Sequence, residues 1–239
     1  MKNSILPNIQ KAKKNGKKLL AILLDPEKTG PDSIPEMTVT LSKSADYIFV
    51  GGSMVANGKT EALVSVLKKY STLPIVLFPG DYTQITDKAN AILFLSLLSG
   101  DNPEYLIRQQ LKSIPQLKNS GLEIIPTGYI LIDGATETSV QRISNTKPIL
   151  SDDTELAVNT AVAGMYMGKE LIYLEAGSGA KNPVPETTIT AVSKSIDIPL
   201  IVGGGIRSRH QLESVYKAGA DLVVIGTAFE ENHHLFDTF

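Results

Sequence analysis

The stretch "YLEAGSGA", Tyr173 to Ala180, places a carboxylate beside two glycines directly after a short apolar run. A carboxylate among apolar neighbours is costly unless it has a partner. Glu175 could therefore bind substrate hydroxyl groups and accept a proton, or it could pair with a Lys or Arg at the rim of the fold. Tyr173 shares a strand face with Glu175, so it could be a core aromatic or a phosphate donor.

Three apolar runs near the end of the chain close in glycine-rich turns. These turns hold Gly177 to Gly179, Gly203 to Gly205, and Gly226 with Thr227. Glycine lets backbone N–H groups approach an anion closely, and a helix N-terminus adds a favourable dipole. One such turn would serve any tight corner, but three in succession predict a phosphate site.

Two earlier runs end in oxygen-bearing side chains, Asp25 in "LLDPEK" and Ser53 in "VGGS". One carboxylate and one hydroxyl make a partial shell for Mg²⁺, which keeps several waters and takes other ligands from substrate phosphates. Asp25 could equally cap a turn before Pro26, and Ser53 could cap the next helix. The spacing alone does not decide between these interpretations.

The sequence does not support histidine-based or cysteine-based chemistry, or nucleic-acid binding. His210, His233 and His234 lie in the last helices and the tail, and none follows a strand, which argues against a histidine metal site or triad. There is no cysteine, so disulfides and thiol catalysis are excluded. The formal net charge of −2 gives no electrostatic argument for nucleic acid.

Eight apolar runs must position these residues. They lie within residues 19–28, 46–53, 73–81, 90–101, 122–134, 170–179, 198–206 and 220–229. Near-continuous apolar runs separated by helical segments are typical of parallel strands that are buried on both faces. The pattern predicts an α/β protein, a single (β/α)8 TIM-barrel domain over residues 1–239, whose functional residues follow the strands.

Two connections are irregular. Only "DYTQITDKAN", about ten residues, separates the third run from the fourth, which is short for a crossover helix with its loops. We expect the helix between strands 3 and 4 to be missing or vestigial. Residues 136–153 form an unusually long stretch between strands 5 and 6.

No segment reaches the roughly 20 apolar residues of a membrane span, and the basic N-terminus lacks the features of a secretion signal. We expect a cytoplasmic protein. The lysine-rich start predicts a solvated helix face, with peripheral contact to anionic lipid as the alternative.

The strings "LLDPEK", "FVGGS", "VLFPG", "YLEAGSGA", "VGGGIRS" and "IGTAF" resemble the geranylgeranylglyceryl phosphate synthase family, prenylglyceryl phosphate synthases related to the bacterial heptaprenyl enzymes. The resemblance runs from about Leu20 to Phe229. The spacer over residues 128–149 resembles the longer branch, which has archaeal and bacterial members.

This resemblance implies transfer of a geranylgeranyl group from its diphosphate to sn-glycerol 1-phosphate, which forms an ether and releases diphosphate. It implies Mg²⁺ held by Asp25 and Ser53, and a homo-oligomer. It also implies a glycerol phosphate site made by Tyr173, Leu174, Glu175, Ala176, Gly177, Ser178, Gly179, Gly203, Gly204, Gly226 and Thr227.

Within this reaction Glu175 is the expected proton acceptor. Lys28 and Arg207 could hold the diphosphate or be rim charges. The gap left by the missing helix, lined by residues 76–90 and 94–100, could admit the prenyl tail, with Leu95 and Ser99 along it.

Two other functions stay open. Another phosphate-binding barrel enzyme, such as an isomerase or a thiamine-phosphate-type synthase, would share the late glycine turns. A non-catalytic binder of prenyl or glycerol phosphates would bind the same ligands without turnover.

Overall fold

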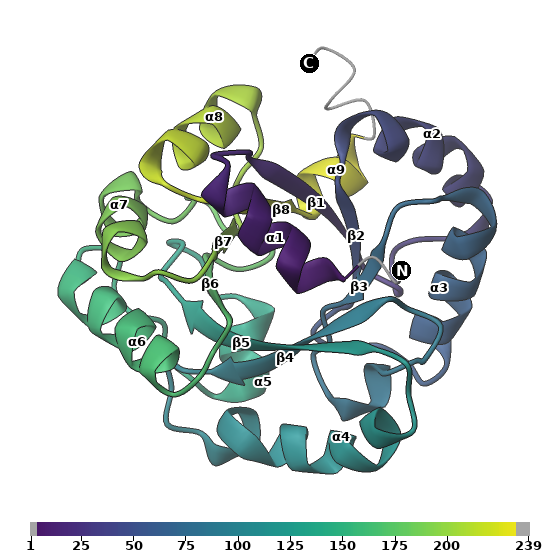
Figure 1. The fold of residues 1–239 in the computed structure, drawn as a ribbon, viewed down its shortest axis with the longest axis horizontal. Coiled ribbons are helices and arrows are strands. Elements are labelled where there is room, and N and C mark those ends of the chain that lie inside the picture. The colour runs from purple at the N-terminus through teal and green to yellow at the C-terminus, as the bar shows by residue number, and fades with distance from the viewer. Residues whose placement is uncertain (1–3, 233–239) are drawn as a thin grey trace.

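The computed structural model describes residues 4–232. Eight parallel strands pair in chain order and the last pairs with the first, which confirms the predicted barrel (Figure 1). The strands are β1 (Leu19–Leu24), β2 (Tyr47–Val50), β3 (Ile75–Leu77), β4 (Ala91–Leu97), β5 (Glu123–Leu131), β6 (Leu171–Glu175), β7 (Leu200–Gly203) and β8 (Leu222–Ile225).

Helices surround the barrel and pack on the outward side chains of the strands (Figure 1). They are α2 (Ile34–Ser44), α3 (Lys59–Tyr70), α4 (Gln109–Lys118), α6 (Thr154–Tyr166), α7 (Glu186–Ser195) and α8 (Arg209–Ala218). Alternate residues of each strand face the other way and fill the barrel interior. On β6 this alternation sends Leu171, Tyr173 and then Glu175 inward, so Glu175 follows two buried interior residues at the strand's end.

The connection from β3 to β4 contains only one helical turn, Tyr82–Gln84, among the described elements. The expected absence of the third helix is therefore confirmed. The buried Gln84 side chain ties this turn to the neighbouring strand ends, since it accepts the N–H groups of Gly52 and Gly80 and donates to the Gly52 carbonyl.

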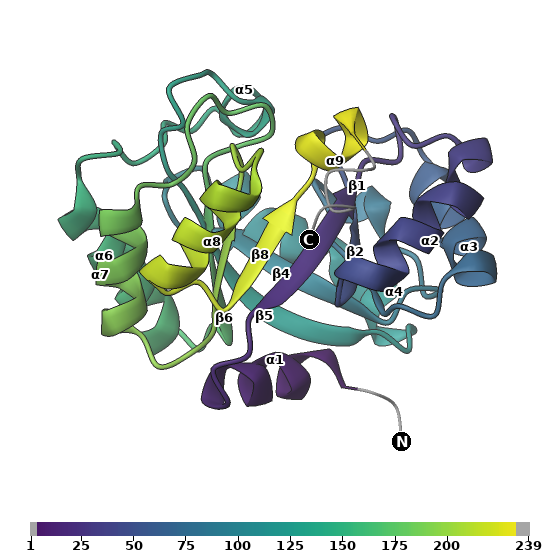
Figure 2. The ribbon, with the colours of Figure 1, turned by 90° about the horizontal axis from the view of Figure 1, so that it is seen from above.

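The long segment after β5 folds over the mouth of the barrel. It contains α5 (Ser139–Ser144), whose capping box joins Thr138 and Gln141. Figure 2 shows α5 at the same end of the barrel as α9 (Thr227–Glu231), which follows β8. Both short helices thus lie at the carboxyl ends of the strands, where function gathers in this fold.

The opposite end of the barrel is closed by α1 (Ile5–Lys14), as Figure 2 shows. Ile5, Ile9 and Ala12 are buried with the interior side chains of the strands. The Glu123 carboxylate accepts the N–H groups of Ile5 and Leu6 at 2.5 and 2.9 Å, which fixes the start of the helix. The lysine-rich helix therefore has the exposed face that the sequence predicted and also a buried face that seals the barrel.

Among residues 4–232, no helix combines the length and the apolar character that crossing a bilayer would need.

The sealing role of α1 predicts that Ile9→Ala lowers the free energy of unfolding by about 2–4 kcal/mol, because Ile9 is 0% exposed. Urea denaturation measures this loss. Ile124→Ala is the matched control, because Ile124 is 43% exposed and should lose much less. Equal losses for the two variants would contradict the sealing role.

Candidate active site

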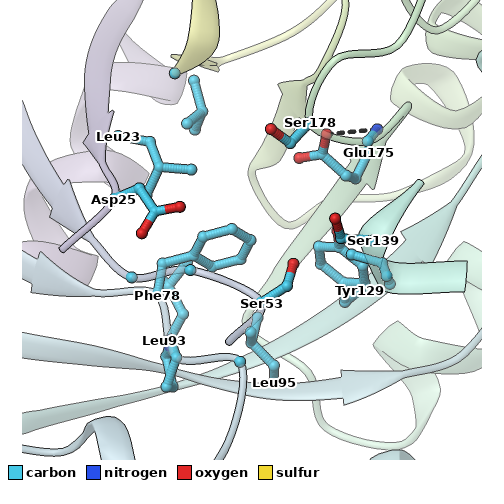
Figure 3. A pocket seen from close by; sticks show the side chains of 18 of the residues that line it. Leu23, Asp25, Ser53, Phe78, Leu93, Leu95, Tyr129, Ser139, Glu175 and Ser178 are labelled. Carbon is cyan, nitrogen blue, oxygen red and sulfur yellow. Dashed lines mark hydrogen bonds between the residues drawn. The ribbon is translucent and has the colours of Figure 1, made fainter. Parts of the chain in front are cut away.

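A cavity of about 390 Å³ opens at the carboxyl ends of the strands. Most residues singled out from the sequence lie along its wall. They are Asp25, Lys28, Ser53, Tyr173, Glu175, Gly177, Ser178, Gly179, Gly204, Arg207, Gly226 and Thr227. Figure 3 shows Asp25 and Glu175 reaching into this space from facing walls. One cavity thus joins the predicted cation site to the predicted phosphate site.

Glu175 is a buried carboxylate, 6% exposed, at the end of β6. Its Oε1 atom accepts the Gly177 N–H at 2.7 Å (Figure 3). Burial raises the pKa of Glu175 to about 7, although the neighbouring Tyr173 hydroxyl and the Gly177 N–H oppose that rise. A carboxyl group poised near neutrality can both give and take a proton. No Lys or Arg pairs with Glu175 among the described residues, so the rim-partner interpretation is wrong.

The turn after β7 makes room for this carboxylate. A Cβ atom on Gly204 would lie 2.4 Å from Glu175 Oε1, and one on Gly203 would lie 2.9 Å from Oε2. Gly204 also has a φ of +84°, which side-chain-bearing residues rarely adopt. The second glycine-rich turn is therefore needed to seat Glu175, whatever else it binds.

Tyr173 is fully buried and packs in an aromatic cluster beneath Glu175. Its ring centroid lies 5.3 Å from that of Phe78 and 5.4 Å from that of Tyr129. Its hydroxyl lies beside the Glu175 carboxylate but makes no well-formed hydrogen bond among the described residues. Burial, and then the Glu175 charge, raise the pKa of Tyr173, so it stays a neutral donor. Tyr173 is a core aromatic whose buried hydroxyl lies next to the Glu175 carboxylate.

The turns after β6 and β8 meet at the cavity wall. Ser178 Oγ lies 3.2 Å from Thr227 Oγ1, so two of the three turns converge on one spot. Three residues of the predicted phosphate site, Leu174, Ala176 and Gly203, are not among those that line the cavity. The Leu174 side chain is buried in the outer core, away from the cavity, and the Ala176 N–H donates to the Gly203 carbonyl. Neither Leu174 nor Ala176 presents a free donor to the cavity.

Asp25 follows β1 on the other side of the cavity. Its Oδ1 atom accepts the Glu27 N–H at 2.9 Å, and its Oδ2 atom lies 4.0 Å from Lys28 Nζ. The carboxylate lies against Gly52, where a Cβ atom would come within 2.7 Å of Oδ1. Asp25 therefore caps its own turn, as one interpretation expected, and it also borders the cavity, which leaves its role as a cation ligand a prediction.

A second acid, Glu27, ties the Asp25 turn to the loop that carries Ser53. It accepts the Ala56 N–H at 2.6 Å and pairs with Lys59. These two partners, the Ala56 N–H first, hold the pKa of Glu27 below its ordinary value, so it is charged at neutral pH. Glu27 therefore links the turn that carries Asp25 to the segment that follows Ser53.

The donor set here suits a hydrated divalent cation. Within residues 4–232 no group of three or more His, Cys, Asp or Glu side chains could hold a metal ion by itself. Asp25 and Ser53 face the cavity as a partial shell that leaves most positions to water and phosphate oxygens, which is how Mg²⁺ is usually bound.

From this polar mouth an apolar arm of the cavity runs toward the segment without a helix. It is lined by Phe78, Leu93, Leu95, Tyr82 and Tyr105, and Figure 3 shows the first three along one side. The expectation that Ser99 lies along this groove is wrong. Ser99 lines a separate polar depression, and its hydroxyl accepts the Leu131 N–H at 2.9 Å.

Several cavity residues were not singled out from the sequence. Ser139 and Arg142 reach the wall from α5, Tyr129 from β5 and Glu230 from α9. Tyr129 could have been found, because it shares the inward face of β5 with Leu131. Ser139 and Arg142 gave no such signal, because they lie in a short helix between strands, where strand alternation does not apply.

The expectation that histidine plays no part agrees with His210, which is exposed on α8. His233 and His234 lie outside the described residues.

Comparison with known proteins identifies the family. The family model described as "PcrB family" matches residues 12–239. A geranylgeranylglyceryl phosphate synthase of Zunongwangia profunda is 56% identical over 95% of this chain and 97% of the relative. The enzyme of that name from Pyrococcus furiosus is 43% identical over 90% of this chain and 85% of the relative.

Solved structures support the same family assignment. (S)-3-O-geranylgeranylglyceryl phosphate synthase from Thermoplasma acidophilum, in complex with its substrate sn-glycerol-1-phosphate, matches with a TM-score of 0.92 and 32% identity, covering 98% of this chain and 94% of that one. A tryptophan synthase α-subunit from Pyrococcus furiosus, with 17% identity and a TM-score of 0.55, shares only the fold. The chain therefore belongs to the PcrB family, alongside the geranylgeranylglyceryl phosphate synthases.

Proposed function

We propose that this protein is a geranylgeranylglyceryl phosphate synthase, which transfers a geranylgeranyl group from its diphosphate to sn-glycerol 1-phosphate. The observation that carries the proposal is one cavity with three parts. A buried carboxylate and converging glycine-rich turns lie on one side, an aspartate and a lysine on the other, and an apolar arm leads away. The names of the relatives and of the bound substrate in the Thermoplasma structure support the same activity.

In this proposal the glycerol phosphate binds against the turns after β6, β7 and β8. The Ser178 and Thr227 hydroxyls and the backbone of Gly179, Gly204 and Gly226 border the cavity there. Hydroxyl and exposed backbone donors suit a phosphate dianion. With the phosphate held by these turns, the glycerol hydroxyls extend toward Glu175, and the Tyr173 hydroxyl is the nearest neutral donor.

Glu175 is the proposed proton acceptor. The glycerol C3 oxygen forms a bond to C1 of the prenyl chain while the bond from C1 to the diphosphate oxygen breaks. The hydroxyl proton passes to the Glu175 carboxylate, and the diphosphate leaves with the bonding electron pair. A pKa of about 7 means that a substantial fraction of Glu175 is ionised and able to accept this proton at neutral pH.

Asp25 and Ser53 are the proposed protein ligands of Mg²⁺, which, when bound, neutralises charge that develops on the departing diphosphate. Lys28 and Arg207 also border the cavity and carry the positive charge that a diphosphate needs. The contact of Lys28 with Asp25 at 4.0 Å favours Lys28 over the exposed Arg207.

We propose that the prenyl tail binds in the apolar arm beside Leu93 and Leu95. That arm leads to the place where the third barrel helix is missing, so a long chain is not blocked by a helix there. Geranylgeranyl is the proposed chain. The oligomeric state and cellular location expected from the sequence stay predictions.

Turnover tests the function directly. Purified protein, Mg²⁺, geranylgeranyl diphosphate and radiolabelled sn-glycerol 1-phosphate should give an organic-extractable product, and sn-glycerol 3-phosphate should give far less. Glu175→Gln should lower kcat by about a hundredfold or more, because a general base contributes roughly 10²–10⁴ in rate.

No product from a folded protein that still binds glycerol phosphate would refute the synthase and favour a non-catalytic binder. Isomerisation of a sugar or indole-type phosphate by the same preparation would favour another barrel enzyme.

Leu95→Trp tests the path of the tail. Extra volume in the arm should reduce kcat/KM for geranylgeranyl diphosphate by about tenfold relative to farnesyl diphosphate, because overpacking costs about 1–3 kcal/mol. Leu150→Trp, at a site that is 62% exposed, is the control and should leave the ratio unchanged. An unchanged ratio in Leu95→Trp would show that the tail runs elsewhere.

A further inference from the structure

The side chain of Glu230 joins α9 to the turn after β1 at the cavity mouth. It lies in α9, directly after β8, and is only 15% exposed. Its Oε1 atom accepts the Asp25 N–H at 3.2 Å, and its Oε2 atom accepts a hydrogen bond from Lys28 Nζ at 3.0 Å. One carboxylate therefore holds both functional residues of the turn after β1.

The same short helix also carries part of the phosphate site. Thr227 is its first residue and lies 3.2 Å from the Ser178 hydroxyl, and Glu230 follows one turn later. The helix bridges the seam where β8 pairs with β1. Glu230 thus fixes the distance between the phosphate turns and the Asp25 turn, which are the proposed seats of the two substrates.

The contact with Glu230 restricts the conformation of the Lys28 side chain. This side chain is 52% exposed, and a free lysine side chain samples many rotamers. An ammonium group has three N–H donors, and Glu230 takes one of them. The pair with Glu230 therefore holds the ammonium near Asp25 while N–H groups stay available to an anion in the cavity.

We propose that Glu230 is a positioning residue for the diphosphate end of the site, which holds the Asp25 turn and orients Lys28 toward the diphosphate. This inference rests on the proposed function for the identity of the anion. The opposite role is that of a competitor, in which the Glu230 carboxylate occupies Lys28 until diphosphate displaces it. The two roles predict opposite effects when the charge of Glu230 is removed.

Glu230→Gln makes this test, because glutamine keeps an oxygen for the Asp25 N–H and loses only the charge that orients Lys28. Calorimetry should show inorganic diphosphate with Mg²⁺ binding about tenfold more weakly to Glu230→Gln than to the unchanged protein. The KM for geranylgeranyl diphosphate should rise by a similar factor, while the KM for sn-glycerol 1-phosphate stays within about twofold.

Glu231→Gln is the matched control, because it removes the same charge from the exposed neighbouring residue and should change neither quantity. In a Lys28→Met background, Glu230→Gln should weaken diphosphate binding no further, since its effect passes through Lys28.

Unchanged binding in Glu230→Gln, or an equal loss in Glu231→Gln, would overturn the inference. Tighter binding would overturn it too and would establish the competitor. Absence of diphosphate binding to the unchanged protein would also overturn it. Failure of the synthase itself is seen separately, as absence of turnover while calorimetry still reports on diphosphate binding.

Discussion

The burial of one carboxylate is the constraint on which the site depends. Glu175 lies among apolar neighbours at the end of β6, with the Gly177 N–H as its hydrogen-bond donor and the Tyr173 hydroxyl beside it. An isolated buried charge would be strongly unfavourable, and the group responds with a pKa near 7. That shift makes a carboxylate useful as a base in a site where no described histidine is available.

The neighbouring glycines and aromatic side chains provide the space and the apolar surroundings of the Glu175 carboxylate. Gly203 and Gly204 leave the space that the carboxylate fills, and the aromatic cluster of Phe78, Tyr129 and Tyr173 excludes water beneath it. Farther down the barrel, α1 seals the opposite end. The cavity lies at the carboxyl ends of the strands, where its polar mouth and its apolar arm suit a small phosphate ester and a diphosphate with a long apolar chain.

Strand alternation carried most of what the sequence could predict. It put Tyr173 and Glu175 on one strand face, the end of an apolar run marked Asp25, and the short span of residues 81–90 predicted the missing helix. The alternation also shows where such prediction failed. Leu174 belongs to the motif, but its side chain faces outward, and Ser99 lies past the end of β4, where alternation no longer fixes direction.

The site residues that the sequence did not predict are positioned by contacts between segments that are distant in the chain. Nothing in the local pattern around Glu230 indicates that its carboxylate reaches Asp25 and Lys28, which lie some 200 residues earlier. The helix α5 likewise borders the cavity only because the chain after β5 folds back over the mouth. Such contacts follow from closure of the barrel, in which β8 meets β1, and a single sequence does not encode them in any nearby motif.

The most direct test of this account is the titration of Glu175 itself. Carboxyl signals of protein labelled with [¹³C]glutamate would be followed against pH, and the Glu175 signal would be assigned as the one lost in Glu175→Gln. This experiment avoids the overlapping titration of the substrate phosphate. The account predicts a midpoint of about 7, raised by burial from the ordinary value of 4.5. A midpoint near 4.5 would contradict it, because Glu175 would then be a solvated carboxylate with no special role as a base.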